Sequence, residues 1–327
     1  MSRGRWIALL GAALVAGLAG SVLVRAATSY PASDITIILP TGPSPGIDPF
    51  LRLLAREAEP ALGKHVVVVN KPGGSWTIGT AEVVRAKPEG YLLALTSNNA
   101  VGFQPLVSKV PYAGPEDYQP IVKLVDAPVG IVVKADAPWK TLGEYVADAK
   151  ARPGKVRAAL PGLLTQADLV LRLFTRAASV DIAGVPFTGG GGEMLNALLG
   201  GHVESAVGNP AIFLAQIKAG KARVLAVFSK TRLAAIPDAP TSIELGYKVT
   251  FPVMYFLMGP KNLDRDALAR LVRVFTDAVK SAKVQAFMNE NGYLAEPLGP
   301  EALAKEINED REIYRTFVQE LKLEGKR

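Results

Sequence analysis

Hydrophobic residues along the chain alternate between short continuous runs and longer stretches with helical spacing. The run at 35–39, Ile-Thr-Ile-Ile-Leu, predicts a buried strand, and residues 48–62 place apolar side chains on one helical face. Strands are expected at 66–69 and 91–95, with a helix over 78–86 between them. This strand, loop, helix, strand order is typical of βαβ units, so we expect a largely parallel sheet.

The same order restarts in the second third of the chain. We expect strands at 127–133, 156–160, 184–187, 203–208 and 223–228, and helices at 141–151, 165–178, 193–199 and 211–219. Thr141, with Glu144 three residues later, predicts a capping box at one helix start. A long helix over 264–281 and further helices to 323 end the chain. Because 327 residues exceed the roughly 250–300 that one core serves, we expect two lobes.

Residues 1–26 have the charge order of a secretory signal peptide. Two arginines precede the uncharged apolar segment 6–24, and the small residues Ala26 and Ala27 follow it. We expect cleavage near Ala26 and export to the periplasm. The alternative is an uncleaved anchor, because an apolar run of this length just spans a bilayer core of about 30 Å. In both cases the rest of the chain lies outside the cytoplasm.

Composition excludes several kinds of chemistry. The chain has no cysteine and only two histidines, His65 and His202, so disulfides, zinc-thiolate sites and cysteine nucleophiles are ruled out. The net charge of +7 falls to +4 without the three arginines at positions 3, 5 and 25. This charge forms no basic run, which argues against nucleic acid and mildly favours an anionic ligand. We expect no catalytic residues, no metal and no cofactor.

Four loops lie where open α/β sheets bind ligands, beyond the carboxyl ends of strands: 40–48, 70–79, 160–166 and 188–193. They are rich in glycine, hydroxyl groups or proline, so they can present backbone N–H groups to an anion while the next helix adds its positive end. The alternative is that these glycines only make tight turns. The predicted ligand-binding residues are Thr41, Gly42, Ser44, Gly46, Asp48, Gly74, Ser75, Trp76, Thr77, Thr165, Thr188 and Gly189.

The glycine loops do not match nucleotide-binding motifs. None ends in Gly-Lys-Ser/Thr, and residues 188–193 place Glu193 where a phosphate would need a lysine. Acidic pairs such as Glu116 with Asp117 are typical of solvated turns rather than of a catalytic dyad. The sequence therefore gives no positive sign of an enzyme.

Motifs along nearly all of the chain after residue 27 carry a family resemblance. The matching segments are 40–52, 68–79, 87–91, 110–112, 185–190, 199–203, 219–227 and 232–246. The most specific is the last, which contains Ile-Pro-Asp-Ala-Pro-Thr at 236–241. In this order and spacing the chain resembles the substrate-binding proteins of tripartite tricarboxylate transporters, the Bug or TctC family.

The resemblance implies an α/β, two-lobed periplasmic-binding-protein fold of the Venus flytrap, type II-like kind. One lobe would be discontinuous, with residues 28–125 plus 250–327, and the other would hold residues 126–249. The resemblance also implies a monomer that catalyses no reaction and delivers a small organic acid to a membrane transporter.

Family members grasp ligand carboxylates with loops that correspond here to 41–48, 73–77 and Thr165 with its preceding loop. This chain departs from the family in those same places. Ser44-Pro45 and Ser75-Trp76 stand where the family has more glycine, Leu163-Leu164 where it has small polar residues, and Asp168 where it has histidine.

A highly charged tricarboxylate needs several polar partners at once, because each buried unpaired charge costs several kcal/mol. The departures replace polar partners with apolar surface. We therefore predict a monocarboxylate or dicarboxylate with an aromatic or aliphatic body, its acid end near Thr165 and its apolar part near Trp76. The alternative is that Trp76 turns away and packs under its loop.

Two other functions stay open at this point. A binding protein of the same fold can report to a sensor kinase instead of a transporter. A bilobal α/β transferase is the alternative from a different class.

Overall fold

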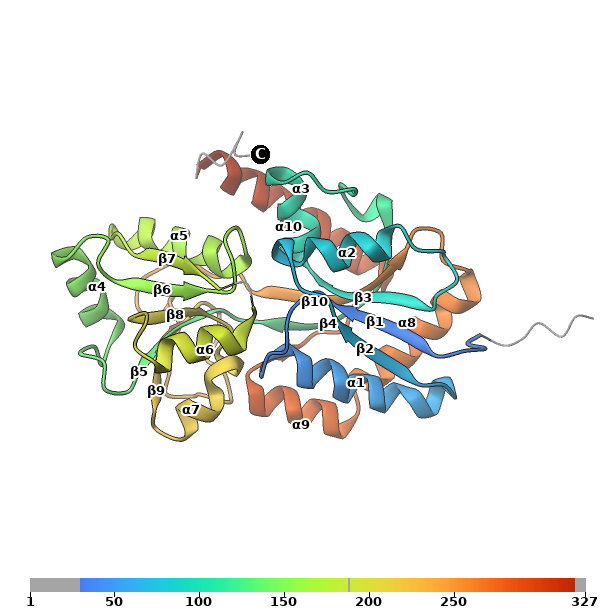
Figure 1. Ribbon diagram of the computed structural model, residues 1–327, viewed down its shortest axis with the longest axis horizontal. Helices are drawn as coiled ribbons and strands as arrows, with labels where there is room; N and C mark the ends of the chain where they lie inside the picture. The colour runs from blue at the N-terminus through green and yellow to red at the C-terminus, as the bar shows by residue number, and fades with distance from the viewer. Residues whose placement is uncertain (1–29, 188, 321–327) are drawn as a thin grey trace, which may run out of the picture.

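The computed structural model describes residues 30–187 and 189–320, which form two α/β lobes lying side by side (Figure 1). Each lobe is built around its own sheet, one with six strands and one with five. The predicted signal segment, residues 1–26, lies outside the described residues. Within the part of the chain that is described, no helix has both the length and the apolarity needed to cross a bilayer.

The first sheet has the strand order β11-β4-β10-β3-β1-β2. Its strands are β1 (Ile35–Leu39), β2 (Val66–Asn70), β3 (Leu92–Ser97), β4 (Tyr118–Ala127), β10 (Val253–Pro260) and β11 (Leu294–Ala295). β1 runs parallel to β2 and β3, whereas β10 runs antiparallel to both β3 and β4. The end of the chain thus inserts a strand between segments from its beginning.

Alternation along β1 divides the core of this lobe into two layers. Ile37 belongs to an apolar cluster with α1 (Ile47–Leu62), α8 (Arg265–Val279) and α9 (Ala282–Asn291). Ile38, the next residue, faces the other side of the sheet, where α2 (Thr77–Val84) and α10 (Pro300–Glu320) pack. Figure 1 shows these helices on the two faces of the sheet.

The second sheet has the order β7-β6-β8-β5-β9. Its strands are β5 (Gly130–Lys134), β6 (Arg157–Leu160), β7 (Ala183–Pro186), β8 (Ser205–Gly208) and β9 (Ala222–Val227), and its helices are α4 (Leu142–Ala151), α5 (Gln166–Ala178), α6 (Gly191–Leu199) and α7 (Leu214–Lys218). The capping box predicted at Thr141 and Glu144 is confirmed, with both reciprocal hydrogen bonds present at the start of α4.

The prediction of largely parallel sheets is wrong, because each sheet mixes parallel and antiparallel pairs. In the second sheet β6 runs parallel to β7 and β8, while β5 runs antiparallel to β8 and β9. The strand predicted at 127–133 exists as β5, but its predicted start is wrong. β4 ends at Ala127 and β5 begins at Gly130, because Pro128 between them cannot donate to a strand ladder.

Two segments connect the lobes, and they lie side by side. The first runs from β4 to β5, and the second enters β10 after Pro252. Ala127 and Val253, which adjoin the two connections, are paired across the sheet. This pairing makes the ends of β4 and β10 one hinge region.

Helix α10 braces this hinge from the side of the first lobe. The Tyr314 ring packs on Phe103 and Phe251, with centroids 5.5 and 5.0 Å away. Its hydroxyl donates to Oε1 of Gln166 on α5 at 2.8 Å. One buried tyrosine therefore contacts both lobes and the second connection.

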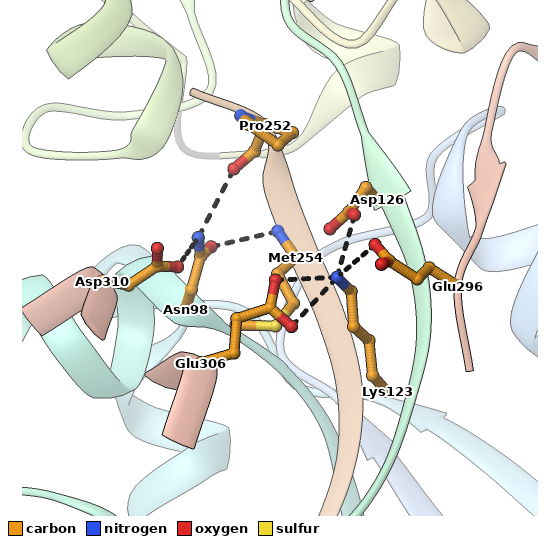
Figure 2. Close-up of polar contacts among 8 residues, drawn as sticks. All are labelled: Asn98, Lys123, Asp126, Pro252, Met254, Glu296, Glu306 and Asp310. Carbon is orange, nitrogen blue, oxygen red and sulfur yellow. Dashed lines mark hydrogen bonds and ion pairs between the residues drawn. The ribbon is translucent and has the colours of Figure 1, made fainter. Parts of the chain in front are cut away.

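A lysine lies fully buried in β4, beside the hinge. Lys123 Nζ is within 3.1 Å of carboxylate oxygens of Asp126, Glu296 and Glu306 (Figure 2). Burial alone would lower the pKa of Lys123, but the neighbouring Asp126 and Glu306 outweigh it and raise the pKa. The lysine is therefore a fixed cation that ties β4 to α10 and to the segment before it.

Asn98 holds the start of β10 next to this cluster. Its amide accepts from the Met254 N–H at 3.1 Å and donates to the Pro252 carbonyl and to Asp310 of α10, at 3.4 and 2.8 Å (Figure 2). The hinge strand is thus linked through one side chain to a buried carboxylate.

Asp126 and Asp310 both have a pKa raised to about 6, in each case chiefly because burial penalises the charged form. Glu306 adds repulsion at both positions, and Lys123 offsets part of the effect. A carboxyl whose pKa is about 2 units higher in the folded state than in the unfolded chain binds its proton preferentially when folded. The stability contributed by that proton is present near pH 4 and is lost as the pH rises to about 6.

We predict that Asp310→Asn reduces the loss of stability that accompanies the rise in pH. Between pH 4 and pH 7 the free energy of unfolding should fall by about 2 kcal/mol less in the variant than in the wild type, since one pKa unit corresponds to about 1.4 kcal/mol and partial exposure weakens the effect. Urea unfolding at a series of pH values measures it. Glu309→Gln, which removes an exposed carboxylate next to it on α10, is the control and should match the wild-type profile. A profile of Asp310→Asn parallel to the wild type would contradict the prediction.

Candidate functional site

A cavity of about 370 Å³ lies between the two lobes. The first lobe contributes the segments after β1 and β2, together with Tyr255 and Tyr293. The second lobe contributes the segments after β6, β7 and β8. The cavity therefore lies beyond the carboxyl ends of strands from both sheets, where α/β folds bind ligands.

Four helices begin at the wall of this cavity. Its lining includes Gly46 and Ile47 at the start of α1, Trp76 before α2, Thr165 to Ala167 at the start of α5, and Gly190 with Gly191 at the start of α6. The first N–H groups of a helix have no partner within the helix, and its dipole is positive at that end. Four positive helix ends from two lobes thus meet at one place.

No charged side chain of the described residues lines the cavity. Its polar groups are neutral, namely backbone groups and the side chains of serine, threonine, asparagine, glutamine and tyrosine. The rest of the wall is apolar, with prolines, aliphatic side chains and three aromatic rings. A bound anion would therefore be held by dipoles and hydrogen bonds and not by a counter-ion.

The loop before α2 adopts a backbone that favours glycine. Gly73 and Gly74 have φ of 132° and 58°, and the next two residues, Ser75 and Trp76, also have positive φ of 51° and 78°. Such a conformation costs a residue with a side chain about 1 kcal/mol. Ser75 and Trp76 thus adopt a backbone conformation that glycine adopts more easily.

Trp76 is part of the wall and is also packed. Its indole stacks on Tyr255 of β10, with ring centroids 5.3 Å apart and an angle of 24° between the planes. Both residues line the cavity. The two interpretations of Trp76 are therefore compatible: the ring packs on its own lobe and presents the remaining surface to the cavity.

The loop before α5 is held by side chains from the opposite lobe. The Leu164 carbonyl accepts from Asn99 Nδ2 at 3.2 Å and from Gln104 Nε2 at 2.6 Å. Ser75 donates to the Leu163 carbonyl at 2.9 Å. Asn99 begins a π-helical turn over Asn99–Phe103, a form often found at functional sites. These bonds fix the lobes in a closed arrangement.

Asp168 shapes the same loop from within the second lobe. Its side chain accepts from the Leu164 N–H at 2.7 Å and pairs with Arg172 at 2.9 Å. Leu164 has a positive φ of 57°. The aspartate at this position therefore supports the turn that carries Thr165 into the cavity wall.

Seven of the predicted site residues line the cavity: Thr41, Ser44, Gly46, Gly74, Ser75, Trp76 and Thr165. Their hydroxyl groups also support the loops, since Thr165 donates to the Gly162 carbonyl and accepts from the Asp168 N–H.

Four other predicted residues, Gly42, Asp48, Thr77 and Gly189, do not line the cavity. Asp48 lies in a separate hollow, paired with Arg52 at 2.8 Å. The Thr77 hydroxyl donates to the Gly74 carbonyl and caps its own loop. Gly42 and Gly189 meet each other at the lobe contact. Thr188 lies outside the described residues.

Sequence reasoning missed Asn99, Asn209, Tyr255 and Tyr293, which also line the cavity. Asn209 follows β8 directly, so the rule that ligands bind beyond strand ends could have found it. The tyrosines carry no such signal, because Tyr255 lies within β10 and Tyr293 follows the end of α9.

Residues 42–46, Gly-Pro-Ser-Pro-Gly, also have the Gly-x-Ser-x-Gly spacing of hydrolase nucleophiles, a match that the sequence reasoning overlooked. Ser44 lines the cavity and its hydroxyl accepts from the Gly46 N–H at 3.3 Å. The described wall contains no histidine, carboxylate or lysine that could act as its base. The serine thus belongs to a glycine-rich turn at the start of α1.

Glycines allow the lobes to approach closely beside the cavity. A methyl group on Gly42 would lie 2.6 Å from the Gly189 carbonyl oxygen of the opposite lobe. A methyl group on Gly191 would lie 2.6 Å from Ser44 Oγ. The closed arrangement therefore depends on the absence of side chains at these contacts.

Two α/β lobes, two adjoining connections and a cavity between them define a protein of the periplasmic binding class. The family model described as tripartite tricarboxylate transporter family receptor matches residues 50–323, and the chain belongs to this family. The resemblance seen in the motifs is thereby confirmed.

Individual proteins agree with this assignment. Protein BugT of Bordetella pertussis (strain Tohama I) is 35% identical over 293 residues, which cover 88% of each chain. Two solved structures, described as a periplasmic transporter and as the periplasmic binding protein BugD, have TM-scores of 0.85 and 0.84 at 30% and 28% identity. Each covers 90% of this chain and 99% of the other chain. These relatives support the two-lobed fold.

We predict that Gly42→Ala weakens ligand binding at least about tenfold, because the added methyl group holds the lobes apart while leaving each lobe folded. Isothermal titration with adipate or terephthalate, whichever binds the wild type, measures the loss. Gly143→Ala is the matched control, since a methyl group there meets nothing closer than 3.8 Å; it should leave the affinity unchanged. Unaltered binding by Gly42→Ala would show that the glycine contact does not belong to the liganded state.

Proposed function

We propose that this protein is a periplasmic solute-binding protein that captures a small organic acid and delivers it to a tripartite tricarboxylate-type membrane transporter. The observation that carries the proposal is the convergence of four helix N-termini from two lobes on a cavity whose described wall has no charged side chain. Helix N-termini bind anions through their N–H groups and their dipoles. A carboxylate is both an anion and a hydrogen-bond acceptor, so it suits the helix dipoles and the N–H groups.

Closure provides the binding energy. With the lobes together, water is excluded from the contacts, and the hydrogen bonds to the acid strengthen in the lower dielectric. The apolar wall adds about 25 cal/mol for each Å² of ligand surface that it buries. The protein catalyses no reaction, and the closed surface of the two lobes is what the transporter recognises.

The ligand is a monocarboxylate or dicarboxylate with an aromatic or aliphatic body. A tricarboxylate would bring three charges into a wall that offers only neutral groups, and each charge without enough partners costs several kcal/mol. The wall near Trp76 and Tyr255 instead includes two stacked aromatic rings. It suits the body of an acid better than further charge.

The two moving units are residues 28–125 with 250–327, and residues 126–249. The protein acts as a monomer.

The segment 1–26 directs export and is removed. N-terminal sequencing of protein from a periplasmic extract tests this, with Ala27 or Thr28 expected as the first residue; intact protein beginning at Met1 in membranes would contradict removal.

The ligand class is tested by melting the protein with citrate, adipate and terephthalate side by side. An acid present at 100 times its dissociation constant should stabilise the fold by about 2.7 kcal/mol, and we expect this for adipate or terephthalate and not for citrate. Tryptophan fluorescence should change with the same acids, because Trp76 is in the cavity wall whereas Trp139 is buried in the second lobe. Stabilisation by citrate alone, with unchanged fluorescence, would overturn this choice of ligand.

A further inference from the structure

Four large aliphatic side chains are exposed around the loop between β2 and α2. Val67 and Val69 of β2 are 46% and 40% exposed, Ile78 in the first turn of α2 is 54% exposed, and Leu163 of the second lobe is 50% exposed. Single exposed apolar residues are common on protein surfaces, but a group of them at one place indicates an interaction site. We call these four residues the rim patch.

The two valines of the rim patch lie where α2 leaves the first sheet uncovered. β2 is an edge strand of this sheet. Val69 pairs with Ile38 of β1, so both side chains point to the face on which α2 packs. A methyl group on Gly79 of α2 would lie 2.9 Å from Ile38. The first turn of α2 therefore covers β1, and Val67 and Val69 stay exposed at the edge beside it.

An ion pair places Ile78 next to these valines. Lys71, directly after β2, pairs with Glu82 of α2. Glu82 follows Ile78 by four residues, so both lie on one side of the helix. This side of α2 therefore faces the end of β2. Because the two charges of the ion pair neutralise each other, they leave no net charge beside the patch.

Leu163 adds the second lobe to the rim patch. Its carbonyl accepts from the Ser75 hydroxyl at 2.9 Å, and Ser75 precedes Ile78 by three residues. A methyl group on Gly162 would lie 3.6 Å from Ser75 Oγ. Opening of the lobes would carry Leu163 away from Ser75 and from the rest of the patch. The rim patch is therefore complete only when the lobes are closed.

The size and charge of the rim patch favour a short-lived contact with a protein. Four half-exposed aliphatic side chains supply at most a few hundred Å², whereas a stable dimer buries about 800 Å² on each partner. An anionic lipid surface attracts clusters of unpaired basic residues, but Lys71 beside the patch is already paired with Glu82. An apolar protein segment that binds briefly fits better than either.

We propose that the rim patch is where the closed protein docks on its membrane transporter, through an apolar segment of a transporter subunit that faces the periplasm. This inference rests on the proposed function and adds the place of contact. A binding protein that delivers its ligand and leaves again needs a weak contact, which a small interface provides. The transporter must also distinguish the closed protein from the open one. A small surface with residues from both lobes meets both requirements.

The test measures uptake of radiolabelled adipate or terephthalate, whichever binds the wild type, in cells whose only copy of the gene encodes the variant. The acid is supplied at a concentration that saturates the wild type and the variants alike. Val69→Thr combined with Ile78→Gln removes apolar surface without adding charge, and neither residue lines the cavity. We expect uptake to fall at least about fivefold, because the docking contact loses buried apolar area. Isothermal titration should give the wild-type affinity for the acid.

Leu163→Ser should also reduce uptake at a saturating concentration of the acid, because it removes the part of the rim patch that the second lobe supplies. Ile313→Gln is the matched control. Ile313 is 42% exposed on α10, which packs on β4, towards the opposite edge of the sheet from β2. This variant should leave uptake unchanged.

Wild-type uptake by the Val69→Thr/Ile78→Gln variant would overturn the inference and leave the proposed function intact. Two other results would also overturn it: a ligand-bound wild-type dimer that the double variant no longer forms, or binding to phosphatidylglycerol vesicles that the double variant loses. If deletion of the gene leaves uptake at the wild-type rate, the proposed function itself fails and the inference fails with it.

Discussion

A negative charge held between two lobes without a counter-ion constrains much of this structure. Because no charged side chain of the described residues lines the cavity, the positive potential has to come from the backbone, and helix N-termini supply it. Each such terminus must follow a strand whose carboxyl end faces the opposite lobe. The parallel pairs, which form one side of each sheet, meet this requirement.

The backbones of the two lobes approach each other closely, and this restricts which residues the sequence can have there. Glycine at positions 42 and 191 leaves room for the opposite lobe, while Ser75, Trp76 and Leu164 keep positive φ at the rim of the cavity. Strain at these three positions is offset by contacts across the cavity, including the bonds of Ser75, Asn99 and Gln104 to the 163–164 loop. Ligand chemistry and lobe closure therefore depend on the same loops.

Buried charged groups beside the hinge tie its strands to the C-terminal part of the chain. Lys123 is surrounded by Asp126, Glu296 and Glu306, so the middle of β4 is tied to the C-terminal part of the chain. Asn98 links the start of β10 to Asp310. Replacing one partner in such a cluster leaves the others buried without compensation, which destabilises a fold strongly. These contacts hold the two connections together.

Much of the fold followed from the sequence, since apolar runs and helical spacing located most strands and helices of both lobes. β4 was not predicted, because Pro120 and Lys123 interrupt its apolar pattern. β10 was not predicted either, although α8 follows it directly. Loop composition predicted the segments around Thr41, Gly74 and Thr165 that line the cavity. Tyr255 and Tyr293 depend on tertiary packing, which no local pattern encodes.

The central claim is that the cavity binds a small organic acid through backbone and neutral side-chain groups. Mass spectrometry of the small molecule released from protein purified without refolding tests this claim most directly. The account predicts a monocarboxylic or dicarboxylic acid with an aromatic or aliphatic body. Release of a tricarboxylate such as citrate would contradict it.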